Sequence, residues 1–155
     1  MTSTEITLVI IVAAGLVSLW IFFRQKANKR IQEVQKEIDG QSILYTDRSA
    51  NFFGQVSRGY KQIRGNGILF ITSEQILFNM WFPDKKLFIP VSSIISFKSP
   101  KSFLGKTKLS RLVQIDFYNE SGYPDAAAWL TCDLESCLKV LDLLRSGQEK
   151  TNDQN

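Results

Sequence analysis

The chain has 155 residues, of which 44% are hydrophobic and 22% are charged, and its formal net charge is +4. It contains no histidine, which excludes catalysis by Ser-His or Cys-His pairs and metal sites built on imidazole. Its two cysteines, Cys132 and Cys137, match neither a C-x-x-C redox motif nor a disulfide framework, so we expect two reduced thiols with a structural role.

The first predicted element is an apolar segment, residues 6–23, which reads ITLVIIVAAGLVSLWIFF and has no charged residue. As a helix it would be about 27 Å long, close to the thickness of the hydrocarbon layer of a bilayer. A cleaved signal peptide would carry its positive charges before the apolar run, whereas here Glu5 precedes it and RQKANKR follows it. A buried core helix would show a polar face, for which Thr7 and Ser18 are too few. We therefore predict a transmembrane anchor over residues 1–25.

The flanking charges predict the orientation of this anchor. Four basic residues lie between positions 24 and 30, and positive residues beside a span remain in the cytoplasm. The expected topology is single-pass, with a short N-terminus outside and the C-terminal domain in the cytoplasm. Residues 26–40 follow as a helical juxtamembrane stalk, because Ile31, Val34 and Ile38 recur at helical spacing before Gly40.

From residue 41 the pattern changes to short strands with turn residues between them. We predict strands at residues 42–46, 52–58, 68–72, 75–82, 87–91, 94–98, 111–119 and 126–132. Gly65-Asn66-Gly67 is typical of a turn, and Pro90 favours an edge strand.

The C-terminal part is predicted to be helical. Asp133 is a favourable N-cap, apolar residues recur at helical spacing from Leu134 to Leu144, and Gly147 would end the helix. Residues 148–155 are polar and predicted to be a disordered tail. A bent antiparallel sheet whose open end is covered by this helix is the expected architecture.

Three segments carry a resemblance to a known family: GILFIT (67–72), QILF (75–78) and LFIPVSSI (87–94). They resemble GRAM domains of the pleckstrin-homology-like (PH-like) superfamily, in which a glycine leads into a strand ending in Thr and an I-P-hydrophobic-x-x-I segment follows. The resemblance covers about residues 42–145. It implies an α+β fold over residues 41–147, with a PH-like bent antiparallel sandwich or barrel of about seven strands and a C-terminal helix. It also implies a non-enzymatic domain that binds lipids or proteins at membranes.

Positive charge is concentrated in the middle of the chain. Residues 48–111 contain eleven Lys or Arg and two acids, whereas residues 112–155 contain three Lys or Arg and eight acids. A basic region beside a membrane favours contact with anionic lipid headgroups. Nucleic acid is not an expected partner, because no nucleic-acid motif is present.

The segment of residues 97–111, FKSPKSFLGKTKLSR, is the first candidate site. Its basic residues are predicted to contact lipid headgroups, and its central pair, Phe103 and Leu104, to insert into the membrane. The basic residues are Lys98, Lys101, Lys106, Lys108 and Arg111. The alternative is a solvated loop whose central pair folds back onto the core.

A second basic patch consists of Arg58, Lys61 and Arg64 around Tyr60, for which solvated strand ends are the alternative interpretation. No catalytic residue, metal site or cofactor is predicted. The expected function is recognition of anionic lipid headgroups at the inner membrane surface. The alternative is a protein-interaction module or a subunit of a membrane-bound complex, without lipid specificity. It would use the sheet edge near Pro90 or a groove beside the helix.

Overall fold

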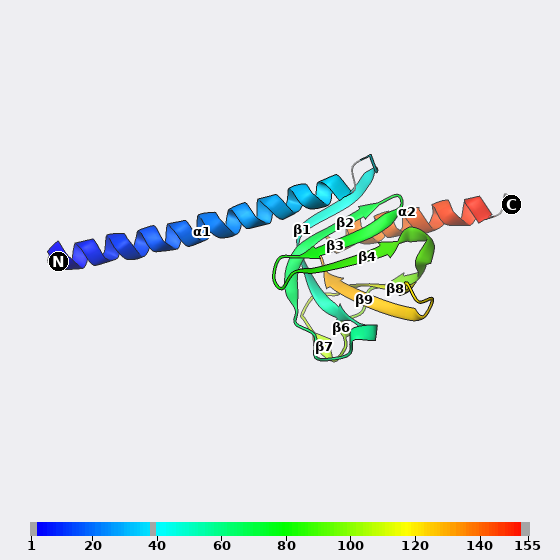
Figure 1. Cartoon of the computed structure of the whole chain (residues 1–155). Helices are drawn as coiled ribbons and strands as arrows, with labels where there is room; N and C mark the ends of the chain where they lie inside the picture. Colours follow the sequence, from blue (N-terminus) through cyan, green and yellow to red (C-terminus); the bar gives the residue numbers. More distant parts are fainter. Residues whose placement is uncertain (1–2, 38–39, 153–155) are drawn as a thin grey trace. The chain divides into compact units, whose positions relative to one another are not determined.

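The computed structural model describes residues 3–37 and 40–152, apart from some side chains of the two helices. The chain divides into two compact units, Met1–Asp39 and Gly40–Asn155. The first contains one continuous helix, α1 (Ser3–Glu37), and the second contains the strands and a C-terminal helix, α2 (Leu134–Asn152), as Figure 1 shows.

The transmembrane anchor predicted over residues 1–25 is wrong. Among the described residues, no helix is both long enough and apolar enough to cross a membrane. The side chains of Thr7, Val9 and Phe23 lie outside the described set. The predicted single-pass topology, with the C-terminal domain in the cytoplasm, depended on this span and is wrong with it.

Seven strands of the second unit form one antiparallel sheet in the order β4-β3-β2-β1-β9-β8-β5. They are β1 (Ile43–Gln55), β2 (Gly65–Thr72), β3 (Gln75–Met80), β4 (Lys85–Pro90), β5 (Ile94–Lys98), β8 (Val113–Tyr118) and β9 (Pro124–Leu130). A separate small hairpin consists of β6 (Ser102–Phe103) and β7 (Lys106–Thr107), and short 3₁₀ helices lie at Val56–Arg58 and Val91–Ser93. The predicted antiparallel sheet with a C-terminal helix is confirmed, and β4, which contains Pro90, is an edge strand. The two strands predicted at residues 42–46 and 52–58 are one continuous strand, β1.

β1 joins the two halves of this sheet. Its pairing with β2 runs from Ile43 to Phe52, and its pairing with β9 runs from Asn51 to Gln55. A register shift lies between Phe52 and Gly54, where Gly54 has φ of +140°. This backbone angle requires glycine, and a Cβ on Gly54 would also displace the end of the Leu104 side chain, whose Cδ1 would lie 2.8 Å away.

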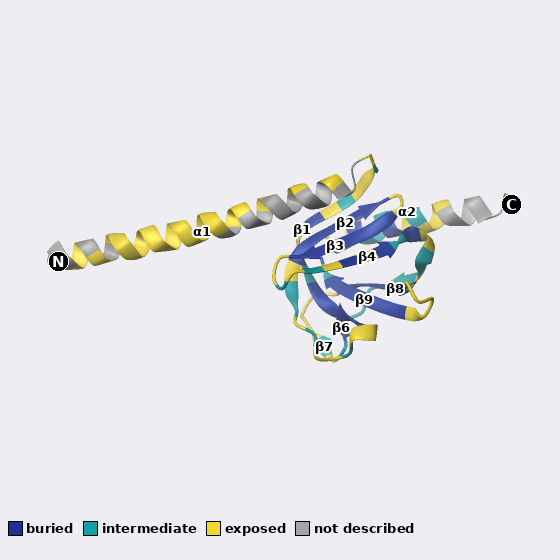
Figure 2. Cartoon of the chain, viewed as in Figure 1, coloured by how far each residue is buried: buried dark blue, intermediate teal, exposed yellow. Residues whose placement is uncertain are grey.

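An aromatic trio from three strands forms the centre of the core. Phe52 of β1 stacks on Phe78 of β3 with ring centroids 5.4 Å apart, and Trp129 of β9 lies 5.8 Å from the first and 6.0 Å from the second. All three side chains are fully buried, and Figure 2 shows buried residues along the central strands. Cys137 and Leu141 of α2 are buried in the same cluster, so the helix covers the open end of the sheet as predicted.

The start of α2 lies where the sequence predicts it, but its end does not. The backbone N–H of Ser136 donates to Oδ1 of Asp133 at 3.0 Å, which is the expected N-cap. At the other end the helix passes through the exposed Gly147 and continues to Asn152. An exposed helical glycine costs only about 0.5–1 kcal/mol, and the following Gln, Glu and Lys favour helix. Residues 153–155 of the predicted tail lie outside the described residues.

The predicted turn at residues 65–67 is wrong, because these residues begin β2. Gly67 pairs with Ala50 of β1 and with Met80 of β3. Its Cβ position lies 2.3 Å from the carbonyl O of Asn79 and 2.6 Å from Cζ of Phe78. The glycine is therefore required by the close approach of a neighbouring strand rather than by a turn.

We predict that Gly67→Ala destabilises the second unit by about 1–3 kcal/mol, because the new methyl group would displace the β3 backbone. Chemical denaturation of the full chain measures this. Gly147→Ala is the matched control, since nothing lies within 4 Å of its Cβ position, and it should be neutral or slightly stabilising. Equal stability of the two variants would contradict the prediction.

Candidate anion-binding site at the loop end

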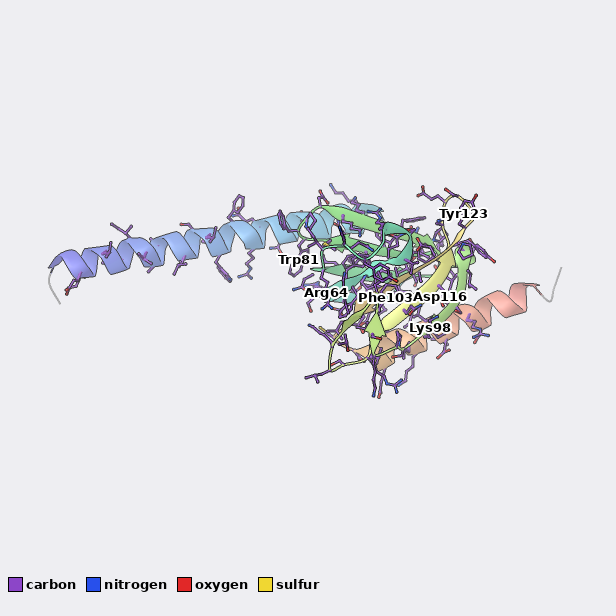
Figure 3. The ribbon with its side chains drawn as sticks, turned by 90° about the horizontal axis from the view of Figure 1, so that it is seen from below. Arg64, Trp81, Lys98, Phe103, Asp116 and Tyr123 are labelled. Carbon is purple, nitrogen blue, oxygen red and sulfur yellow. The ribbon has the colours of Figure 1, made fainter. Side chains whose placement is uncertain are left out.

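Three connections of the sheet come together at one end of the second unit, which we call the loop end. They are the β1–β2 connection (residues 56–64), the β3–β4 connection (residues 81–84) and the β5–β8 connection (residues 99–112). Figure 3 shows Arg64 and Trp81 on this side of the domain, whereas Tyr123 of the β8–β9 connection lies on the opposite side. Residues far apart in the sequence therefore meet here.

Gln62 links the three connections through its polar atoms. Its Nε2 donates to the carbonyl oxygens of Gln55, at 2.5 Å, and Gly59. Its Oε1 accepts from the backbone N–H of Gln55 at 3.0 Å and from Nζ of Lys85 at 3.3 Å. Its backbone oxygen accepts from Nζ of Lys106 at 3.0 Å. The Gln62 side chain thereby shapes the β1–β2 connection. Gln62 also holds Lys85, at the start of β4, and Lys106, of the β5–β8 connection, beside it.

Two arginines lie near the lysines that Gln62 holds, Arg58 near Lys85 and Arg64 near Lys106. We call these four residues the cation cluster: Arg58, Arg64, Lys85 and Lys106. Burial, Arg58 and Lys106 lower the pKa of Lys85 from 10.5 to about 8. Burial and Arg64 lower the pKa of Lys106. These directions mean that the charged forms are crowded and partly desolvated in the folded chain.

Aromatic rings beneath the cluster partly compensate for the lost water. Nζ of Lys85 lies 4.2 Å from the centre of the Phe52 ring, and Cζ of Arg64 lies 4.2 Å from the centre of the Phe53 ring. Nζ of Lys106 also donates to the backbone oxygen of Phe53 at 3.2 Å. The rings and carbonyls attract the cations but carry no net charge, so the positive potential of the cluster persists.

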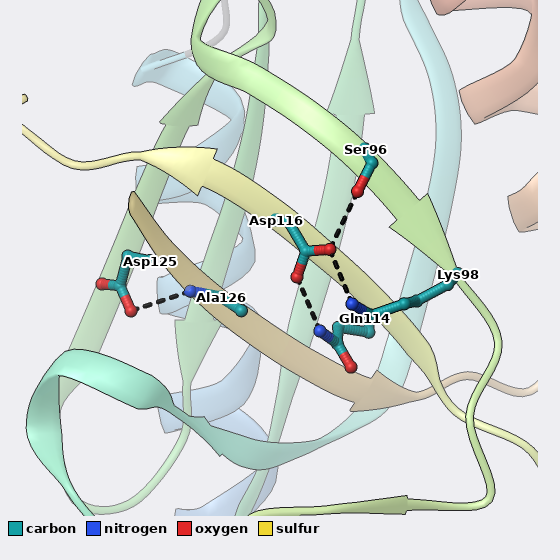
Figure 4. A network of polar contacts seen from close by, with 6 residues as sticks. All are labelled: Ser96, Lys98, Gln114, Asp116, Asp125 and Ala126. Atoms are coloured by element: carbon teal, nitrogen blue, oxygen red, sulfur yellow. Dashed lines mark hydrogen bonds and ion pairs between the residues drawn. The ribbon is translucent and has the colours of Figure 1, made fainter. Parts of the chain in front are cut away.

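Asp125 fixes the end of β1 that leads into the site. Its carboxylate accepts from Nε2 of Gln55 at 2.6 Å, from Oγ and N of Ser57 at 2.6 and 2.9 Å, and from the N–H of Ala126 at 2.8 Å. Figure 4 shows the last of these contacts. Burial raises the pKa of Asp125, but the hydrogen bonds from Ser57, Gln55 and Ala126 outweigh it and leave the pKa below its ordinary value. This carboxylate is engaged in holding the loop.

Lys98, the first basic residue predicted for lipid contact, lies apart from the cation cluster in an ion pair. Its Nζ lies 2.9 Å from Oδ2 of Asp116, which also accepts from Ser96 at 2.8 Å (Figure 4). Oδ1 of Asp116 accepts from Gln114 at 2.6 Å. Burial raises the pKa of Asp116, but the hydrogen bonds from Lys98, Gln114 and Ser96 together lower it. The charge of Lys98 is therefore neutralised on the β5–β8 pair.

The other basic residues predicted for contact divide between the loops. Lys106 belongs to the cation cluster, as do Arg58 and Arg64 of the predicted second patch. The remaining four, Lys61, Lys101, Lys108 and Arg111, are exposed on the β1–β2 and β5–β8 connections. Sequence reasoning missed Lys85 and Gln62, for which the only signal was a lysine directly after the Pro83-Asp84 turn.

Phe103 and Leu104, predicted to insert into a membrane, face the interior in this structure. Phe103 is buried in a small cluster with Phe53 and Leu112, and Leu104 packs against the same cluster and against Gly54. Insertion of this pair would require it to leave the cluster. In this position the two side chains anchor the β5–β8 connection to the sheet.

A second concave surface lies beside the edge strand β4. A groove of about 590 Å³ lies between β4 and the β8–β9 connection, and Phe88, Pro90, Tyr118 and Glu120 contribute to its lining. Phe88 and Tyr118 are half exposed. This groove coincides with the sheet edge near Pro90 that the alternative protein-binding interpretation uses. Among the described residues, no group of three His, Cys, Asp or Glu side chains could hold a metal ion.

No protein-family model and no curated protein matches the chain. Its fold is similar to that of a chain in "The 8S snRNP Assembly Intermediate", with a TM-score of 0.53 and 9% identity over 68% of this chain and 83% of that chain. The C-terminal domain of an unknown protein from Leishmania infantum has a TM-score of 0.49 and 14% identity, over 76% and 94% of the two chains. The Vps36 N-terminal PH domain has a TM-score of 0.48 and 17% identity, over 70% and 84%. At such identities the likeness concerns the fold alone, an antiparallel sheet of seven strands with a C-terminal helix.

We predict that Lys85→Met raises the melting temperature of the full chain at pH 7, because it removes a crowded charge and keeps most of the side-chain length. The folded pKa of about 8 lies below the unfolded value of 10.5, so the folded state holds fewer protons between these limits. The stability of the unsubstituted chain should therefore rise relative to the variant from pH 8 to pH 10.5. Lys101→Met is the control, and its stability relative to the unsubstituted chain should not change over this pH range. A difference in stability between Lys85→Met and the unsubstituted chain that does not depend on pH would contradict the prediction.

Proposed function

We propose that the second unit is a non-catalytic binding module whose loop end holds the phosphate groups of anionic lipid headgroups at a membrane surface. The observation that carries the proposal is the cation cluster, in which Gln62 holds Lys85 and Lys106. Arg58 lies beside Lys85, and Arg64 lies beside Lys106. A phosphate oxygen accepts charge-assisted hydrogen bonds from both guanidinium and ammonium groups. Such an anion would offset the burial, and the repulsion by Arg58 and Lys106, that together lower the pKa of Lys85.

Charged side chains such as Lys98 are neutralised elsewhere in the sheet, whereas the cation cluster brings like charges together, and this difference supports a binding role. Elsewhere in the sheet, Lys98 is placed beside a carboxylate, and Asp125 is surrounded by donors. At the loop end the chain instead brings cations beside other cations and partly buries them, which destabilises the free domain. Perturbed ionisable groups in this kind of arrangement are typical of functional sites. The PH-like architecture and the GRAM resemblance of the segments over residues 67–94 agree with a module that binds lipids.

The proposal predicts that the double variant Arg58→Met, Lys85→Met binds phosphatidylserine-containing vesicles about 30-fold more weakly at low salt. Each basic residue near an anionic surface contributes about 1 kcal/mol, which is about fivefold in affinity. The measured quantity is the ratio of full-chain binding to phosphatidylserine-containing and to pure phosphatidylcholine vesicles, because binding through α1 contributes to both. Lys139→Met on α2 is the control, and an unchanged ratio in the double variant would remove the proposal.

The same site predicts a pH dependence of binding. Lys85 is protonated in the free domain only below its pKa of about 8, and a bound anion favours the protonated form. The ratio of binding to the two kinds of vesicle should be constant below pH 7 and fall as the pH rises above 8. In Lys85→Met this fall should be absent. If the binding ratio of Lys85→Met falls by the same amount above pH 8, a group other than Lys85 is responsible and the prediction is wrong.

A second candidate function is binding of an extended protein segment along β4. It is favoured by the groove beside this strand, by the half-exposed Phe88 and by the place of β4 at the edge of the sheet. The solved chain with the 0.53 TM-score belongs to an assembly intermediate, which agrees with such a role but concerns that protein. Arg58 also lines this groove, so the discriminating variant leaves it unchanged. Binding of a protein partner that is lost in Phe88→Glu and retained in the Arg64→Met, Lys106→Met variant would favour this function.

A further inference from the structure

Large apolar side chains are exposed on all three connections of the loop end. In the β1–β2 connection, Tyr60 is 74% exposed and Ile63 is 67% exposed. In the β3–β4 connection, Phe82 is 84% exposed, and in the β5–β8 connection Leu109 is fully exposed. We call these four residues the apolar tips. Single exposed apolar residues are ordinary, but one or more on every loop at the same end calls for a physical reason.

Basic residues lie close in sequence to the apolar tips. Lys61 and Arg64 surround Ile63, Lys85 and Lys86 at the start of β4 follow Phe82 after Pro83 and Asp84, and Lys108 and Arg111 flank Leu109. Protein-binding surfaces tend to be poor in lysine. Aromatic and aliphatic side chains mixed with Lys and Arg are instead typical of segments that lie at the boundary between headgroups and acyl chains. The composition therefore favours a bilayer with anionic headgroups over a protein partner.

The packing beneath the tips supports this interpretation. Gln62 holds a lysine of each of the other two segments against the β1–β2 connection, and the buried Phe103 anchors the β5–β8 connection from inside. The loops are thus held by contacts that do not use the apolar tips. Side chains that contribute nothing to the folded core remain available for an external apolar phase.

We infer that the loop end enters an anionic bilayer with Tyr60, Ile63, Phe82 and Leu109 as the inserting side chains, while the cation cluster lies at the level of the headgroup phosphates. The inference rests on the proposed function and adds the residues that enter the acyl boundary. It assigns to these tips the role that sequence reasoning gave to Phe103 and Leu104.

Tyr123 provides a matched control on the opposite side of the domain. It is 71% exposed, but its connection reads NESGY and contains an acid and no basic residue. Figure 3 shows it far from Arg64 and Trp81 in this view. An exposed aromatic residue without neighbouring cations should stay in water.

The test measures the depth of Trp81, beside Phe82, in the full chain carrying Trp20→Phe. Vesicles contain phosphatidylserine and phosphatidylcholine with brominated acyl chains, which quench indole emission on contact. Trp129 is fully buried and serves as the unquenched reference. We expect quenching of Trp81 emission in this background and its loss in the triple variant Tyr60→Ser, Phe82→Ser, Leu109→Ser, with at least tenfold weaker binding. Tyr123→Ser should behave like the unsubstituted background.

Two results would overturn the inference, and they differ from failure of the proposed function. If Trp81 is not quenched although the preference for phosphatidylserine persists, the loop end binds headgroups without insertion. If the triple variant keeps both its affinity and its quenching, the apolar tips are not the inserting residues. If the unsubstituted chain instead binds phosphatidylserine-containing and pure phosphatidylcholine vesicles equally well, the proposed function is wrong. Near-ultraviolet circular dichroism of the buried Trp129 verifies that each variant is folded.

Discussion

The bend of β1 is the constraint on which the rest of the second unit depends. A single strand pairs first with β2 and then with β9, and the register shift beside Gly54 turns it from one half of the sheet into the other. This turn brings Phe52 against Trp129, which closes the core between strands far apart in the sequence. It also carries Gln55 to Asp125, so the β1–β2 connection begins from a fixed point. The geometry of the loop end thus follows from the same strand that completes the sheet.

Stability and binding oppose each other at the loop end. The hydrogen bonds of Gln62 stabilise the β1–β2 connection, yet they bring Lys85 and Lys106 together and beside two arginines. The donors of Lys85 and Lys106 satisfy oxygen atoms of Gln62 and Phe53, but these hydrogen bonds do not require further cations beside them. Proteins commonly retain such local destabilisation where a ligand compensates for it. An anion at the cluster would turn the repulsion into attraction, so binding and folding would be thermodynamically linked.

The elements of this domain could be predicted well from the sequence, but the partners of individual side chains could not. Alternation of apolar residues indicates a strand whatever its neighbours are, whereas the role of Gly67 depends on the approach of β3. Counting charges selected Lys98 without revealing that Asp116 neutralises it across the β5–β8 pair. Phe103 and Leu109 are both apolar residues of one basic segment, and only the folded chain shows which is buried. These distinctions arise from contacts between distant residues, which a local pattern does not contain.

The correction of the predicted span changes which interactions the proposed membrane contact must use. A membrane anchor would hold a weakly binding loop at high effective concentration beside the bilayer, so without the predicted span the affinity must come from the loop end itself. Two contributions remain at the loop end itself. The attraction of its basic residues to anionic headgroups weakens with salt, whereas transfer of the apolar tips out of water does not. At high salt, the difference in binding between the unsubstituted chain and the Tyr60→Ser, Phe82→Ser, Leu109→Ser variant therefore reports the entry of the apolar tips, because binding through α1 is common to both chains. The salt-dependent difference between the unsubstituted chain and the Arg58→Met, Lys85→Met variant reports the cation cluster.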